Sequence, residues 1–182
     1  MACLRSNKIT LCVTSCDQWI GFSFCYGLLH GKARDCIEKV YCGVTDENHE
    51  WAKMLRKENR VHLFKYSEDH MQDISKYFKE SDAVILGPVH QHLSQSGEPH
   101  VPRLWKCFLE CAKEVQVRCL TMLSVLNLDK AEGQHLKMLF HMEKMFKECV
   151  EGGGHGQHRG HQMHGLVLRM ALPMEHLYFF QD

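Results

Sequence analysis

A polar turn near the N-terminus has the placement of a phosphate-binding loop. Residues 14–21 read Thr-Ser-Cys-Asp-Gln-Trp-Ile-Gly and separate an apolar run ending at Val13 from a second apolar run, Trp19 to Leu29. A strand, a tight turn and a helix in this order can hold a dinucleotide, because backbone N–H groups at the helix N-terminus bind the pyrophosphate. Such a loop uses three glycines, one each for the turn, for close approach of the phosphate and for helix–strand packing.

Only the last of these glycines is present. When the loop is aligned on Gly21, the other two positions hold Ser15 and Gln18. These residues adopt positive φ less readily than glycine, and the Gln18 side chain fills space that a pyrophosphate needs. We therefore expect a dinucleotide-binding fold with a degraded phosphate site. The candidate cofactor contacts in this loop are Thr14, Ser15, Gln18, Trp19, Ile20 and Gly21.

Length and charge limit the class of protein. The 182 residues suit one domain with a substantial core, so we treat 1–182 as a single domain. Lys plus Arg and Asp plus Glu both number 22, and this balance gives no basic field for nucleic acid or an anionic membrane. No apolar run approaches the ~20 residues that span a bilayer. Without a recognisable export signal, the sequence predicts a cytoplasmic protein.

The chain has ten cysteines, which is a large number for a cytoplasmic protein. It contains no C-x-x-C pair, and several cysteines fall within apolar segments. This placement favours small hydrophobic residues in a reduced core over a disulfide framework, with a thiol switch as the alternative. The cysteines predicted to lie inside apolar elements are Cys12, Cys16, Cys25, Cys36 and Cys42.

Short β-rich runs alternate with longer amphipathic runs along the chain. The strand candidates are Lys8–Val13, Lys39–Val44, Val61–Tyr66, Ala83–Leu86, Val117–Leu123 and Gly165–Met170. The helix candidates lie near 19–30, 47–58, 70–79, 100–114 and 130–149. Asp46 is the predicted N-cap of the second helix. This alternation predicts an α/β fold, a doubly wound parallel sheet of about six strands with helices on both faces.

Two segments interrupt the alternation. Residues 88–102 contain three of the four prolines and form a loop after the fourth strand, at the edge where such sheets bind ligands. Residues 151–165 contain six glycines and four histidines, a composition that predicts neither helix nor strand. We expect a flexible, solvated insertion there and no dedicated metal site, since a glycine tract does not hold imidazoles in place. Adventitious binding of Zn²⁺, Cu²⁺ or Ni²⁺ is the alternative.

Several segments resemble the NmrA-like class of atypical short-chain dehydrogenases. They are Val13-Thr14 with Ile20-Gly21, the run 82–88 (Asp-Ala-Val-Ile-Leu-Gly-Pro), Leu123-Ser124, and Arg169 with Glu175 six residues later. The resemblance implies a Rossmann-type NAD(P)-binding domain. It places the adenosine side of a cofactor near Thr45 and the nicotinamide side near Gly87, Pro88 and Ser124.

The same comparison shows what the chain lacks. The family's Tyr-x-x-x-Lys pair is represented by Phe140 and Lys144, and a phenyl ring has no proton to donate. NADP-preferring relatives have an arginine after the second strand, where this chain has Thr45 and Asp46. The resemblance thus implies weak or absent binding of NADP or NAD and no catalytic residue. Relatives also continue into a smaller C-terminal lobe, so we expect a C-terminally truncated form.

We therefore expect a non-catalytic or vestigial NAD(P)-fold protein that acts as a regulator reporting redox status. One alternative is an NAD(P)H-dependent oxidoreductase of the atypical short-chain type, with water supplying the proton. A second alternative is an interaction module. In that case the apolar tail, residues 171–182, contacts a protein partner or a second copy of the chain.

Overall fold

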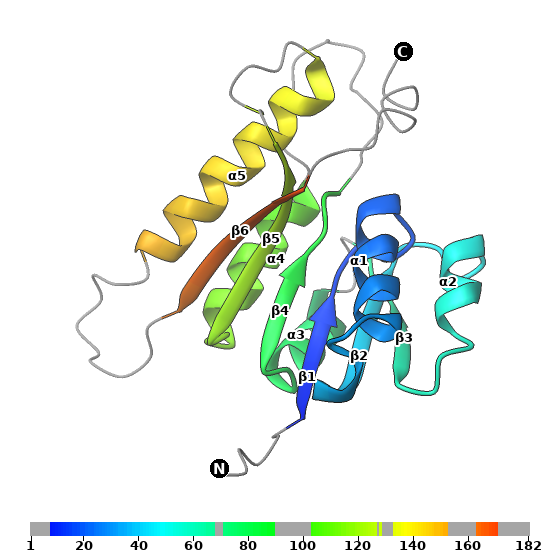
Figure 1. Ribbon diagram of the computed structural model, residues 1–182. Coiled ribbons are helices and arrows are strands. Elements are labelled where there is room, and N and C mark those ends of the chain that lie inside the picture. The colour runs from blue at the N-terminus through cyan, green and yellow to red at the C-terminus, as the bar shows by residue number, and fades with distance from the viewer. Residues whose placement is uncertain are drawn as a thin grey trace, which may run out of the picture.

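A parallel six-stranded sheet forms the centre of the protein, with strand order β3-β2-β1-β4-β5-β6 (Figure 1). The computed structural model describes residues 8–67, 71–89, 103–126, 128, 133–152 and 163–170. The strands are β1 (Ile9–Val13), β2 (Ile37–Val44), β3 (Val61–Lys65), β4 (Ala83–Leu86), β5 (Cys119–Val125) and β6 (His164–Met170). The strand order reverses between β1 and β4, which is the point where doubly wound sheets bind ligands. The predicted fold class is confirmed.

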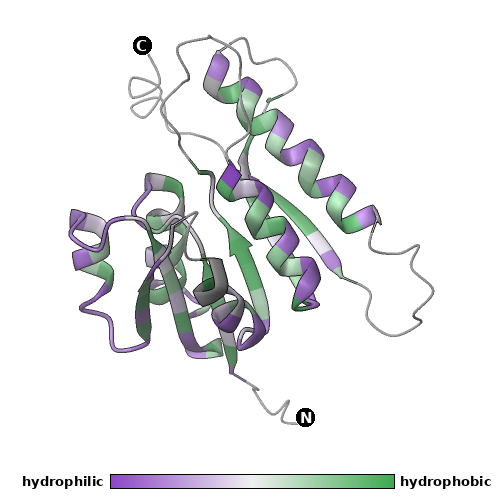
Figure 2. Ribbon diagram, turned by 180° about the vertical axis from the view of Figure 1, so that it is seen from behind, coloured by the Kyte–Doolittle hydropathy of each residue, from purple (hydrophilic) through white to green (hydrophobic). Residues whose placement is uncertain are grey.

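Helices cover both faces of this sheet. They are α1 (Trp19–His30), α2 (Glu50–Leu55), α3 (Met71–Lys79), α4 (Arg103–Glu114) and α5 (Gln134–Gly152), with a short 3₁₀ turn η1 (Arg34–Cys36) before β2. Helices α1 and α2 lie together on the face seen in Figure 1, whereas α4 and α5 lie on the face turned toward the viewer in Figure 2. None of the helices in the described part of the chain combines the length and apolarity needed to cross a bilayer.

The sheet interior is apolar because parallel strands are covered on both faces. The strands are mostly green on the hydropathy scale of Figure 2, while purple residues follow the outer sides of the helices. Trp105 of α4 is fully buried, and its Nε1 donates a 3.2 Å hydrogen bond to the Met142 carbonyl of α5. This bond joins the two helices.

Two local predictions are wrong. The second helix begins at Glu50, and its N-cap is His49, whose Nδ1 accepts from the backbone N–H of Trp51. The Asp46 carboxylate instead accepts from the N–H of Asn48, two residues on, so it stabilises a turn rather than a helix start. Cys36 is exposed in η1, although we expected it inside an apolar element.

The glycine- and histidine-rich stretch is shorter than we predicted. Helix α5 continues to Gly152 and β6 begins at His164, so residues at both ends of 151–165 belong to regular elements. A Cβ at Gly165 would lie 2.5 Å from the Val150 side chain, so this glycine lets α5 pack closely on β6. Three of the four histidines and the tail, 171–182, lie outside the described residues.

Candidate functional site

The turn after β1 has a positive-φ residue at the position that we aligned with the first glycine of a phosphate loop. Ser15 adopts φ of 57°, a conformation that non-glycine residues rarely occupy. Its backbone N–H donates to the Tyr66 hydroxyl at 3.1 Å, and its own hydroxyl donates to the Gly87 carbonyl at 3.4 Å. These bonds offset the cost of the strained conformation. They also commit the Ser15 polar atoms to the protein itself.

Two glycines allow the turn to pack against its neighbours. A Cβ at Gly21 would lie 2.2 Å from the Ser15 carbonyl oxygen, and a Cβ at Gly87 would lie 2.7 Å from the Thr14 carbonyl oxygen. The Gly87 N–H donates to the Thr14 hydroxyl at 3.1 Å. The start of α1 and the end of β4 therefore meet the turn backbone to backbone. Pro88 follows Gly87 and is buried.

Asp17 fills the side of the turn that faces the end of β2. Its Oδ2 accepts hydrogen bonds from the Thr45 N–H at 2.7 Å, the Thr45 hydroxyl at 2.5 Å and the Asp46 N–H at 2.9 Å. Its Oδ1 is buried without a hydrogen-bond partner among the described residues. In doubly wound domains the end of the second strand receives the ribose of the cofactor. Here the donors of that position bind the protein's own carboxylate.

The other predicted loop residues lie at the start of α1. Gln18 is half-buried and precedes the helix; its N–H donates to the Ser15 carbonyl, and its side chain makes no capping hydrogen bond. Trp19 is half-buried with its ring 5.9 Å from that of Trp51. Ile20 is buried in the core. The structure thus gathers the predicted residues of the turn but commits several of them to packing.

A buried carboxylate lies at the ends of β5 and β6. Glu143 of α5 is 1% exposed, and it accepts a 3.0 Å hydrogen bond from the Ser124 hydroxyl. Arg169, the register partner of Ser124 on β6, donates to both Glu143 oxygens, and the Lys147 ammonium lies 2.8 Å away. Ser124 is fully buried, so its hydroxyl serves this network in the structure.

The charge of Glu143 depends on these partners. Burial by itself would raise the pKa of the carboxyl, but hydrogen bonds from Arg169, Lys147 and Ser124 outweigh burial and lower the pKa from the ordinary 4.5 to about 2. Glu143 is therefore an ionised structural anchor near neutral pH. It cannot act as a general acid, because it has no proton to give.

The remaining candidates for proton transfer are dispersed. Phe140 and Lys144 lie on the exposed side of α5, and Lys144 is 4.0 Å from Glu148 on the same helix. Within the described ranges, no acid–base pair is assembled beside the turn.

Sequence reasoning missed three residues of this region. The sequence motifs assign no role to Asp17 at the end of β2, to the Tyr66 hydroxyl or to the Glu143 carboxylate. An acidic residue in a turn placed to receive a pyrophosphate was the available signal for Asp17. Nothing local indicates the partner of Tyr66, because the Ser15 contact spans 51 positions.

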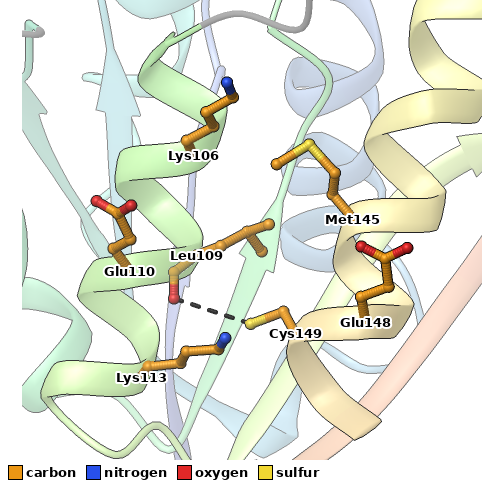
Figure 3. Close-up of a pocket in the computed structure, with 7 residues that line it drawn as sticks. All are labelled: Lys106, Leu109, Glu110, Lys113, Met145, Glu148 and Cys149. Carbon is orange, nitrogen blue, oxygen red and sulfur yellow. Dashed lines mark hydrogen bonds between the residues drawn. The ribbon is translucent and has the colours of Figure 1, made fainter. Parts of the chain in front are cut away.

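A separate groove lies between α4 and α5 (Figure 3). Its volume is about 240 Å³, and its floor includes Cys149, whose thiol donates to the Leu109 carbonyl at 3.9 Å. Two lysines and two glutamates line the groove, so their formal charges sum to zero. The residues that line it are Lys106, Leu109, Glu110, Lys113, Met145, Glu148 and Cys149.

Comparison with known proteins supports the fold. No protein-family model matches the chain, and no curated protein is similar to it in sequence. Among solved structures, DesIV, a dTDP-glucose 4,6-dehydratase from Streptomyces venezuelae with NAD and TYD bound, matches with a TM-score of 0.69 at 13% identity over 88% of this chain and 55% of its own.

Two further solved structures match a similar share of this chain. WbmH from Bordetella bronchiseptica in complex with NAD⁺ has a TM-score of 0.61 at 12% identity, covering 90% of this chain and 56% of its own. The NADPH-dependent quinone oxidoreductase QOR2 from Escherichia coli, complexed with NADPH, has a TM-score of 0.60 at 13% identity, covering 87% and 48%. The chain thus spans about half the length of these proteins and has a Rossmann-like fold.

Proposed function

We propose that this protein is a divergent, non-catalytic member of the NmrA-like class that acts as a regulatory binding module. Asp17 is the observation that carries the proposal. Its carboxylate takes the three donors at the end of β2 that would otherwise face a ribose or a 2′-phosphate. Because the Asp17 carboxyl already holds these three donors, they are not free to bind a ribose hydroxyl or a 2′-phosphate.

The phosphate and nicotinamide positions support the same conclusion. The side chains of Ser15 and Gln18 stand where a phosphate loop has bare backbone. The Ser124 hydroxyl is committed to Glu143, and Phe140 replaces the proton-donating tyrosine. We infer that NADP or NAD binds weakly or not at all.

Calorimetry with a loop-restored variant tests this proposal. We expect the wild-type chain to bind NADPH and NADH with Kd weaker than ~1 mM, and the triple variant Ser15→Gly, Asp17→Ser, Gln18→Gly to bind at least about tenfold more tightly. The control is Gln116→Gly, because Gln116 also has φ of 57° but lies outside the turn. Wild-type Kd below ~100 μM, with NADPH oxidation on addition of a quinone, would overturn the proposal in favour of the oxidoreductase alternative.

One observation favours an interaction role for the far edge of the sheet. Leu166 and Leu168 of β6 are 57% and 37% exposed. Because they are alternate residues of one strand, their side chains lie on the same face of the sheet. Gly165 and Arg169 contact α5 on the opposite face, so the two leucines point away from α5. An exposed pair of leucines on an edge strand is a surface that a protein partner or a second copy can cover.

A further inference from the structure

Three cysteine sulfurs converge directly beneath the turn after β1. Cys16 comes from the turn itself, Cys25 from the middle of α1 and Cys42 from β2. The Sγ atoms of Cys16 and Cys25 are 3.5 Å apart, those of Cys25 and Cys42 are 3.7 Å apart, and all three lie within 4.8 Å of one another. The three residues are free thiols with no exposed surface.

The size of this triangle matches a metal–thiolate site. A thiolate bound at about 2.3 Å in trigonal or tetrahedral geometry lies on the order of 4 Å from its neighbouring thiolate. The separations of 3.5 and 3.7 Å are slightly shorter than that value, and the third separation is at most 4.8 Å. Sulfurs from a turn, a helix and a strand need only small rotations to bind one ion.

The donor set selects the metal. Thiolates are soft ligands that favour Cu⁺ and Zn²⁺ and disfavour Mg²⁺ and Ca²⁺. A structural Zn²⁺ is almost always held by four ligands. Among the described residues no histidine, aspartate or glutamate joins the three sulfurs. The cluster is also buried away from water, which could otherwise supply a fourth ligand.

We propose that Cys16, Cys25 and Cys42 form a three-coordinate binding site for Cu⁺. The ion replaces thiol protons, including the one that Cys16 donates to the Val13 carbonyl at 3.2 Å. Binding therefore releases protons and weakens as the pH falls. Because the sulfurs are buried, the ion enters when the turn opens or while the chain folds. Once bound, it fixes the turn to both α1 and β2.

Competition for Cu⁺ in reduced, metal-free protein tests the site. We expect one equivalent of Cu⁺ to be withdrawn from the chromophoric chelator bicinchoninate, with X-ray absorption showing three sulfurs at about 2.3 Å. We expect the bound ion to raise Tm as well. Failure to compete with the chelator, or absorption data with two sulfurs or with oxygen and nitrogen ligands, would overturn the proposal. Binding of Zn²⁺ in preference to Cu⁺ would overturn it too.

Cysteine variants locate the ion. Cys16→Ala, Cys25→Ala and Cys42→Ala should each lower Cu⁺ affinity at least about 100-fold, because losing a direct ligand should cost more than losing a group hydrogen-bonded to a ligand, which costs roughly 10–100-fold. Cys111→Ala is the matched control, because Cys111 is a buried free thiol on α4, on the other side of the sheet. Each variant is checked for folding by circular dichroism. Unchanged affinity in a folded cluster variant, or equal loss in Cys111→Ala, contradicts the assignment. If a variant fails to fold, the wild-type absorption data still decide.

Discussion

At the scale of single residues, the turn after β1 has a glycine-like backbone conformation at Ser15, but its side chains bind other parts of the protein. Ser15 keeps the positive φ of a glycine position because Tyr66 and Gly87 bind its polar atoms. Asp17 then uses the resulting geometry to reach the end of β2. The loop therefore has a positive-φ residue where a phosphate loop has glycine, while the Ser15 polar atoms and Asp17 Oδ2 are hydrogen-bonded within the chain.

The low pKa of Glu143 leads to a prediction about the stability of the protein in acid. Its pKa is about 2 in the folded protein, below the ordinary 4.5, so folding favours the ionised form. The stabilisation is complete above about pH 4.5 and is lost as the pH falls toward 2. We expect Glu143→Gln to lower the free energy of unfolding on the order of 2 kcal/mol at pH 7. The difference from wild type should shrink below pH 4.

Urea unfolding at several pH values measures this effect. Glu148→Gln is the control, because Glu148 is an exposed residue of the same helix whose contact with Lys144 is 4.0 Å long. We expect its free energy of unfolding to stay within about 0.5 kcal/mol of wild type. A Glu143→Gln variant that tracks wild type at every pH would show that the network contributes nothing net.

The site was only partly predictable at this scale. The loss of two glycines could be read from Ser15 and Gln18 directly, because glycine spacing is a local property. The hydrogen bonds that Asp17 accepts from Thr45 and Asp46 could not be predicted. These partners lie 28 and 29 positions away and come within reach only when β2 pairs with β1. The three-cysteine cluster was hidden for the same reason.

At the scale of elements, two glycines of α1 have opposite surroundings. A Cβ at Gly21 would lie 2.2 Å from the Ser15 carbonyl, whereas a Cβ at Gly27 would meet nothing within 4 Å. We expect Gly21→Ala to destabilise the protein by at least about 2 kcal/mol, because the backbone must shift. We expect Gly27→Ala to stabilise it by about 0.5–1 kcal/mol through helix propensity. Thermal unfolding of the pair checks both signs, and equal effects would mean that α1 does not pack on the turn as described.

The elements themselves were largely predictable. All six strands were predicted, with bounds within two residues of the observed ones, because buried parallel strands are short apolar runs. The N-cap of α2 was not predictable. His49 caps the helix in place of Asp46, although histidine is not among the preferred N-cap residues. The ends of α5 and β6 extend into the glycine-rich stretch because packing at Gly165 outweighs local preference.

At the scale of the whole molecule, the two halves of the sheet are covered differently. Helices α1 and α2 lie over β1, β2 and β3 on the face seen in Figure 1. The Leu166 side chain belongs to that same face, since register links it through Thr121, Ile85 and Val13 to Cys42, which contacts α1. No helix of the described residues covers β6 there.

This uneven cover leads to a prediction about association. If β6 is an interaction edge, the double variant Leu166→Lys, Leu168→Lys should dissociate the self-associated or partner-bound form, because two charges would face the apolar contact. Both leucines are well exposed, so the free energy of unfolding should change by no more than about 0.5 kcal/mol each. Sedimentation velocity over a concentration series measures the association. Met54→Lys is the control, since Met54 is 45% exposed on α2, which contacts β3 at the opposite edge of the sheet. Identical monomeric sedimentation of wild type and both variants would remove β6 as a self-association surface, whereas loss in Met54→Lys as well would point to general charge repulsion.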